Sequence, residues 1–326
     1  MQDTKKCSRE HFENETPLKL KQSKNIGRGP IARKVIASAQ YQLQKKVTNL
    51  SDWREAKIRA EDFQKTIISQ NKLTEYDPVH GLYIYGQNLL SVLIEQLCEL
   101  PMLDKLADAY AQAEEEYMPS GPPMSPLTGS YFTCWGAFDL CAGTKRETFG
   151  TIGIDLYNFL NVDEGLITLF EKMQASRMGL FKHEGTSGDY VFLRELITNK
   201  EIKVISASGY SGNPGEIWFA RVLPPPFESN TQFDYSIVFT TPYVLGKIGS
   251  RKEFIPFVEG DWLDYFERNL IRTKINEKEA AYEYLMKYGL SRNYWNEYVF
   301  LSYRNYQHDM ILLEGFPDIP SSLPHS

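Results

Sequence analysis

The spacing of apolar and polar residues changes twice along this chain and divides it into three parts. Residues 30–117 carry apolar positions three or four apart, the period of amphipathic helices, with breaks at Pro78 and Pro101. Residues 130–250 carry short β-branched and aromatic runs, with one helix predicted over 163–178, and helical spacing returns over 251–326. The pattern predicts an α+β fold: a helical N-terminal region, a central antiparallel β region that holds a small barrel, and a helical C-terminal cap.

The strands predicted in the middle part are short and bounded by turn residues. They cover residues 131–140, 148–156, 190–196, 201–206, 216–223 and 235–240. The first two, separated by the turn residues Gly143 and Thr144, predict a β-hairpin. Because short barrel strands need their edges covered, we expect the flanking helices to pack on them and form one composite unit.

Three further segments differ from their surroundings in composition. Residues 1–29 mix charged, Asn, Gln and Gly residues with few apolar ones, which predicts a flexible basic arm. Residues 118–129 are rich in proline and predict an extended linker, with a ligand for an aromatic groove of another protein as the alternative. Ser291 is a candidate N-cap for a last helix.

The charge distribution is uneven along the chain. Residues 1–72 hold 16 Lys and Arg against 8 Asp and Glu, whereas the remainder holds 20 against 34. A basic segment of this kind binds nucleic acid, an anionic surface or an acidic protein, or it docks on the acidic part of its own chain. An ordinary solvated tail with charged helix faces explains the same numbers, so these alternatives stay open.

Cysteine usage and hydropathy indicate the compartment. The four cysteines, Cys7, Cys98, Cys134 and Cys141, match neither a CxxC motif nor a compact disulfide framework, which favours reduced thiols in a cytoplasmic protein. No run reaches the roughly 20 apolar residues that a membrane-spanning helix needs. We therefore expect no membrane partner.

Most catalytic motifs are missing. The stretch nearest to a nucleophile elbow has Asn213 where the motif needs glycine, and no phosphate-binding loop is present. None of the five histidines pairs with another at helical spacing. We therefore expect neither a resident cofactor nor a resident metal.

One candidate catalytic site remains. Asp189 opens one predicted strand, and Glu201 and Lys203 share one face of the next, an arrangement that resembles that of restriction-endonuclease-like nucleases. In that chemistry two carboxylates hold Mg²⁺ or Mn²⁺ and a lysine supports the attack of water. The sequence departs from the pattern because Gly188 precedes Asp189 and no helix is predicted between Ile202 and Leu223. A cross-strand charge pair explains the same residues without catalysis.

Binding of nucleic acid without catalysis is a further alternative. Small β-barrels present aromatic and basic side chains to single strands. The middle part offers such residues: Tyr190, Phe192, Arg194, Lys203, Tyr210, Trp218 and Arg221. The acidic balance beyond residue 72 opposes phosphate binding, and several of these aromatics are needed to fill the barrel.

The segment from Arg194 to Pro224 resembles a known one. The runs Leu193-Arg194-Glu195-Leu196-Ile197-Thr198-Asn199-Lys200-Glu201 and Pro214-Gly215-Glu216-Ile217-Trp218-Phe219-Ala220-Arg221-Val222-Leu223-Pro224 are similar to a small β-barrel segment of uncharacterised bacterial proteins. Some of those proteins carry a zinc motif like the SecA C-terminus, which is absent from this sequence. The resemblance covers about 60 residues and implies a bacterial source and a compact barrel, but no activity.

These observations together favour a non-catalytic function. We expect a binding or regulatory accessory protein of a bacterial multi-component system, in signalling or defence, that acts through protein–protein contacts in the cytoplasm. The alternatives are the metal-dependent nuclease of Asp189, Glu201 and Lys203, and nucleic-acid binding through the basic residues 1–72.

Overall fold

We describe the fold from a computed structural model of the 326-residue chain. It describes residues 29–44, 67–118, 120, 127–226, 233–288, 303–306 and 309–314, together with residues 54, 55, 57, 58, 61, 62 and 65. The predicted basic arm up to residue 28, most of the predicted linker and the predicted N-cap Ser291 lie outside this set.

The helical part of the fold surrounds one long helix. Its elements are α1 (Pro30–Gln44), α3 (Gln70–Leu73), α4 (Pro78–Cys98), the 3-10 turn η1 (Pro101–Leu103), α5 (Asp104–Tyr117), α6 (Gly129–Phe138), α7 (Phe149–Leu160) and α8 (Glu164–Ala175). The carboxylate of Asp77 caps α4 by accepting from the backbone of Val79 at 3.0 Å, and Pro78 starts the helix. Helices predicted from period and proline breaks are confirmed in this part.

Two predicted strands are wrong, because residues 131–140 and 148–156 fall in helices α6 and α7. Local signals favour the helices: the hydroxyl of Thr128 accepts from the backbone of Tyr131 at 3.1 Å, and Thr148 with Thr151 forms a capping box. The buried residues of α7, Phe149, Ile152, Gly153 and Leu156, recur at helical spacing, whereas α6 is buried over most of its circumference and shows no one-sided apolar stripe. A short apolar run without a stripe is equally typical of a buried strand and of a buried helix.

A closed barrel of five strands forms the centre of the molecule. It consists of β1 (Met178–Ser187), β2 (Tyr190–Glu195), β3 (Glu201–Ser206), β4 (Ile217–Leu223) and β5 (Ser236–Val238). The order is β1-β2-β3-β5-β4, and the pairing of β4 with β1 closes the ring. The pairing of β3 with β5 is parallel and the other pairings in the ring are antiparallel, so the barrel is mixed and not purely antiparallel as predicted.

The C-terminal part adds both helices and strands to the barrel. Strand β6 (Tyr243–Ile248) pairs with β4, with β7 (Phe254–Pro256) and, in parallel, with β9 (Ile311–Glu314), which in turn pairs with β8 (Tyr303–Tyr306). Helices α9 (Glu259–Leu270) and α10 (Lys278–Tyr288) follow the predicted helical spacing. The region 251–326, predicted as a helical cap, thus holds two helices and in addition the strands β7, β8 and β9, which the sequence pattern did not predict.

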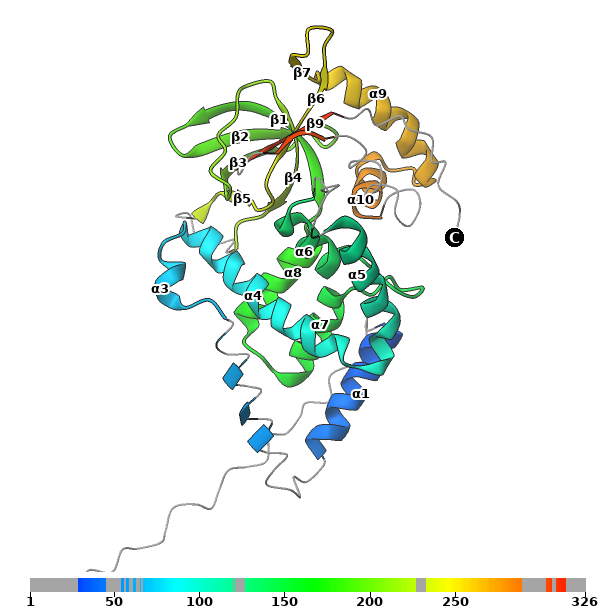
Figure 1. Ribbon diagram of the computed structural model, residues 1–326. Coiled ribbons are helices and arrows are strands. Elements are labelled where there is room, and N and C mark those ends of the chain that lie inside the picture. Colours follow the sequence, from blue (N-terminus) through cyan, green and yellow to red (C-terminus); the bar gives the residue numbers. More distant parts are fainter. Residues whose placement is uncertain are drawn as a thin grey trace, which may run out of the picture.

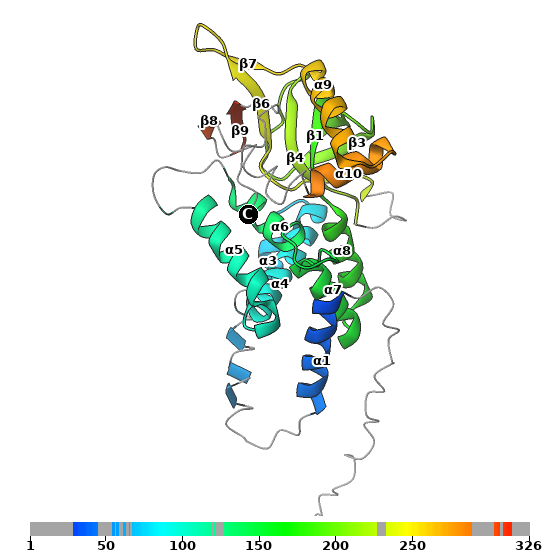
Figure 2. The same ribbon diagram turned by 90° about the vertical axis from the view of Figure 1, so that its right-hand side faces the viewer.

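The barrel stands on the helical layer, and α9 and α10 cover one of its sides (Figure 1). A view turned by 90° shows the same two tiers, with α4, α6 and α8 directly below the barrel (Figure 2). Hydrogen bonds join the tiers: the hydroxyl of Tyr83 donates to the carbonyl of Pro224, and that of Tyr235 donates to Asp77, both at 2.6 Å. Within the part of the chain described above, no helix has the length and apolar character needed to cross a bilayer.

Candidate binding face of the barrel

The outer surface of the barrel is covered on one half. Leu180 and Phe219 point outward from β1 and β4 and pack in one core cluster with Phe266 of α9 and Tyr282 of α10. The Tyr282 hydroxyl also accepts from the Leu180 backbone at 3.2 Å. This half is interior to the fold and offers no surface to a ligand.

A buried ionic group fixes the covered half to the helices. Asp139, the C-cap of α6, pairs with Arg221 of β4 and, at 2.9 Å, with Lys287 of α10. Lys287 also donates to the carbonyls of Gln174 at 2.7 Å and Ser176 at 2.8 Å. One carboxylate at the end of α6 therefore holds two buried cations, one from β4 and one from α10, and we name Asp139, Arg221 and Lys287 the junction.

The other half of the barrel, formed by β2 and β3, is open. Along β2, Val191, Leu193 and Glu195 are buried inside, whereas Tyr190, Phe192 and Arg194 alternate outward. Phe192 is 40% exposed, and its partner across the ladder is Lys203 of β3. We name the outward side of β1, β2 and β3 around Phe192 the open face.

A β-bulge bares one flank of the Phe192 ring. The register between β1 and β2 shifts between His183 and Gly185, and Gly185 then lies opposite Phe192. Gly185 has no side chain, and a Cβ placed there would meet no atom within 4 Å. Bulges of this type re-aim neighbouring side chains at sheet surfaces. The bulge leaves an aromatic ring accessible on a rigid strand.

The cations of the open face, Lys182, Arg194 and Lys203, are already paired with carboxylates. Arg194 donates to Glu184 at 2.9 Å and to Glu259 at 2.9 and 3.1 Å, and Lys182 lies 3.3 Å from Glu259. Lys203 donates to Asp234 at 2.5 Å. The hydrogen bond from Arg194 lowers the pKa of Glu259, and the one from Lys203 lowers the pKa of Asp234. Paired in this way, these cations add little attraction for a polyanion.

A polar cluster closes the end of the barrel beside the open face. The buried carboxylate of Glu216 accepts from the Tyr210 hydroxyl at 3.1 Å, the Asn213 amide at 2.9 Å and the Trp218 indole at 2.9 Å. Burial, and after it the Glu216 carboxylate, raises the pKa of Tyr210, which keeps the phenol a donor. The buried ring of His183 bonds the carbonyl of Ser211 at 2.8 Å. The cluster holds the loop between β3 and β4 against the barrel.

Of the three residues of the nuclease alternative, Glu201 and Lys203 lie on β3 and Asp189 lies in the turn between β1 and β2, and the three do not converge. Glu201 is opposite Arg194, whereas Asp189 lies in the turn five residues before Arg194. At about 3.3 Å per residue, roughly 16 Å of strand separates the backbone positions of Asp189 and Glu201, too far for both carboxylates to bind one metal ion. Lys203 is engaged with Asp234 and lies 5.0 Å from the ring centre of Tyr190.

Other candidate chemistry is likewise buried or dispersed. Trp218 and Arg221, considered above as nucleic-acid contacts, are at most 1% exposed. Burial raises the pKa of the Cys134 thiol to about 11, which keeps it protonated and unreactive at neutral pH. In the segments that the structure describes, no three His, Cys, Asp or Glu side chains gather as metal ligands would.

Comparison of the chain with protein-family models, curated proteins and solved structures found no match. The candidate face is therefore inferred from its geometry alone.

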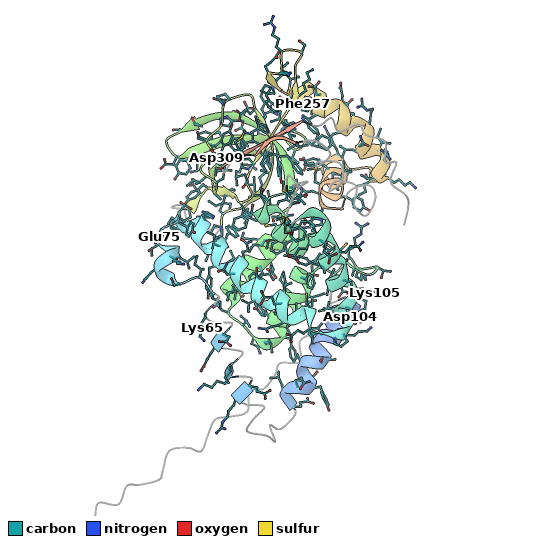
Figure 3. The ribbon with its side chains drawn as sticks, in the orientation of Figure 1. Lys65, Glu75, Asp104, Lys105, Phe257 and Asp309 are labelled. Carbon is teal, nitrogen blue, oxygen red and sulfur yellow. The ribbon has the colours of Figure 1, made fainter. Side chains whose placement is uncertain are left out.

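Asp309, which precedes β9, lies on the barrel side (Figure 3), and its negative charge helps to raise the pKa of Tyr210.

Proposed function

We propose that this protein is a non-catalytic accessory protein that binds another protein through the open face, with Phe192 as the central contact. The observation that carries the proposal is an exposed aromatic side chain on a rigid strand, bared by the bulge at Gly185. Aromatic side chains surrounded by polar residues are typical centres of protein interfaces.

The position of the face in the barrel supports a binding function. The circular strand order, with a long bulged β1 that pairs with both β2 and β4, is that of a Greek-key barrel of the OB type. Such barrels bind oligonucleotides and oligosaccharides on the face of their second and third strands, which makes this face the usual binding surface of the fold. In this chain the same strands form the half of the barrel that α9 and α10 leave open (Figure 1).

The charges on the face favour a protein over a nucleic acid. Lys182, Arg194 and Lys203 are each bound to carboxylates, and the exposed carboxylate of Glu201 adds another negative charge. Phosphate binding needs cations that release counterions, and paired cations do not supply them. Salt-bridged pairs around an apolar centre instead resemble the polar rim of a protein interface.

A photo-crosslinking experiment tests the proposal in cells that express the native chain. A photoreactive phenylalanine analogue at position 192 is compared with the same analogue at Leu160, which is also 40% exposed but lies at the end of α7. We expect one dominant protein adduct from position 192 and none from position 160, and the Phe192→Ala variant should lose the same protein in a pull-down. Equal adducts from both positions, or nucleic acid as the adduct, would contradict the proposal.

A further inference from the structure

The β6–β7 hairpin forms a second exposed feature, separate from the open face. It projects beyond the rest of the fold in both ribbon views (Figures 1 and 2). Two backbone hydrogen bonds close its turn: Gly249 donates to Glu253 at 2.9 Å, and Lys252 donates to Gly249 at 3.0 Å. At its base Phe257, labelled in Figure 3, is buried against Trp262 of α9. The turn of the hairpin is therefore closed by backbone hydrogen bonds, and its base is packed against α9.

The tip of this hairpin carries unpaired positive charge. Lys247, Arg251 and Lys252 are exposed within six residues of chain, and no ion pair joins them to any residue for which the structure gives a position. The cations of the open face, by contrast, are bound to carboxylates. The three cations of the hairpin tip are therefore available to an anionic ligand.

The backbone at Lys252 adds a second observation. Its φ of +64° places it in the left-handed region, where glycine or asparagine is the usual residue in a hairpin turn. A lysine there costs stability relative to glycine, and such costs are found where the side chain serves a function. Lysine at this position therefore carries a backbone cost that glycine would avoid.

We propose that the β6–β7 hairpin binds the phosphates of double-stranded DNA through Lys247, Arg251 and Lys252. A two-stranded ribbon fits the major groove of B-form DNA, which is about 12 Å wide, whereas the corresponding groove of A-form RNA is too narrow. Arginine binds phosphate through two parallel hydrogen bonds, and lysine binds it as a point charge. The turn residues 249–252 include no apolar side chain, and Ile255, an exposed apolar residue of the hairpin, lies back along β7, so a lipid surface fits less well.

The salt dependence of DNA binding by the full-length chain tests this site. Fluorescence anisotropy with a short labelled DNA duplex gives the slope of log K against log salt, which is about −0.9 for each phosphate contact. We expect the triple variant Lys247→Gln, Arg251→Gln and Lys252→Gln to reduce the magnitude of that slope by up to about 2.7. The matched control changes three exposed lysines elsewhere, Lys105, Lys145 and Lys278, to Gln and should leave the slope unchanged; Lys105 lies in the helical tier (Figure 3).

A single substitution separates binding from folding. Lys252→Gly relieves the left-handed backbone, so the thermal midpoint should stay the same or rise, while the slope loses about 0.9. Absence of DNA binding at low salt, or an unchanged slope in the triple variant, would overturn the proposal. It would also be overturned if phosphatidylserine vesicles, an acidic peptide or an RNA duplex bound as tightly as DNA and lost binding equally in the triple variant. Loss of the slope in the control variant would place the contact elsewhere and would also overturn it.

Discussion

The two halves of the barrel surface use polar side chains in opposite ways. On the covered half, Asp139, Arg221 and Lys287 are nearly inaccessible and join three elements. On the open face, the ion pair of Lys203 with Asp234 lies at the surface and joins β3 to the segment before β5, and Arg194 pairs with Glu259 at the start of α9. Removing a partner from a buried ion pair leaves an uncompensated charge, whereas removing one from an exposed pair changes little.

This difference assigns separate tasks to the two halves. The covered half ties the barrel to the helical tier, so its substitutions are expected to affect folding. The open face makes few contacts that stabilise the fold, so its exposed residues are free to serve binding. The comparison fails if a variant of the junction leaves stability intact or if a variant of the open face unfolds the protein.

The largest effect is expected for Asp139→Ala. The change leaves Arg221 and Lys287 buried without their common carboxylate, which should lower the free energy of unfolding by about 3–5 kcal/mol. Urea denaturation followed by circular dichroism measures the loss. The matched control is Asp234→Ala, which removes an exposed carboxylate paired with Lys203 and should leave the midpoint unchanged. Similar losses in the two variants would show that burial does not distinguish these pairs.

An intermediate effect is expected for Glu216→Ala at the closed end of the barrel. The change deprives Tyr210, Asn213 and the buried Trp218 indole of their acceptor. An unsatisfied buried donor costs about 1–3 kcal/mol, and tryptophan fluorescence during urea unfolding reports the loss together with any change around Trp218. Glu201→Ala, an exposed carboxylate on β3, is the control. If both variants retain full stability, the loop between β3 and β4 does not depend on the Glu216 carboxylate.

A pH-dependent effect is expected from Lys287. Burial lowers its pKa from the ordinary 10.5, partly offset by Asp139. Because the folded protein then binds this proton less tightly than the unfolded chain does, charged Lys287 costs stability at neutral pH. The cost disappears as the pH rises from the lowered pKa towards 10.5. In urea titrations over this range, the wild type should gain stability relative to Lys287→Met by at most about 1.4 kcal/mol per pH unit. Parallel pH profiles would contradict this assignment.

The sequence predicted the barrel better than the elements that border it. The period of two and the turn residues placed β3 at its observed bounds of 201–206 and β2 and β4 within one residue. Strand β1 was missed, because Met178 to Phe181 are all buried and show no alternation that a strand pattern would reveal. The predicted helix over 163–178 ran into it, although α8 ends at Ala175.

The candidate face could be predicted only in part. Alternation along β2 and β3 was enough to place Glu201 and Lys203 on one face and to include Phe192 among the aromatic candidates. The bulge opposite Phe192 depends on how β1 pairs with β2, and that register is a tertiary property. Burial of Trp218 and Arg221 could not be inferred either, because it arises from packing against the barrel interior and the helical tier.

The smallest effect on stability, and the sharpest test of the open face, is expected for Phe192→Ala. The ring is 40% exposed, and its neighbour across β1 is Gly185, so its removal should change the free energy of unfolding by less than about 1 kcal/mol. Binding of the crosslinked partner, measured by calorimetry, should weaken at least tenfold, because truncating a central aromatic contact costs about 2 kcal/mol or more. Leu160→Ala, with the same exposure on α7, should leave binding unchanged. A Phe192→Ala variant that binds as tightly as the wild type would contradict the comparison of the two halves. The open face would then contribute neither to binding affinity nor to the free energy of unfolding.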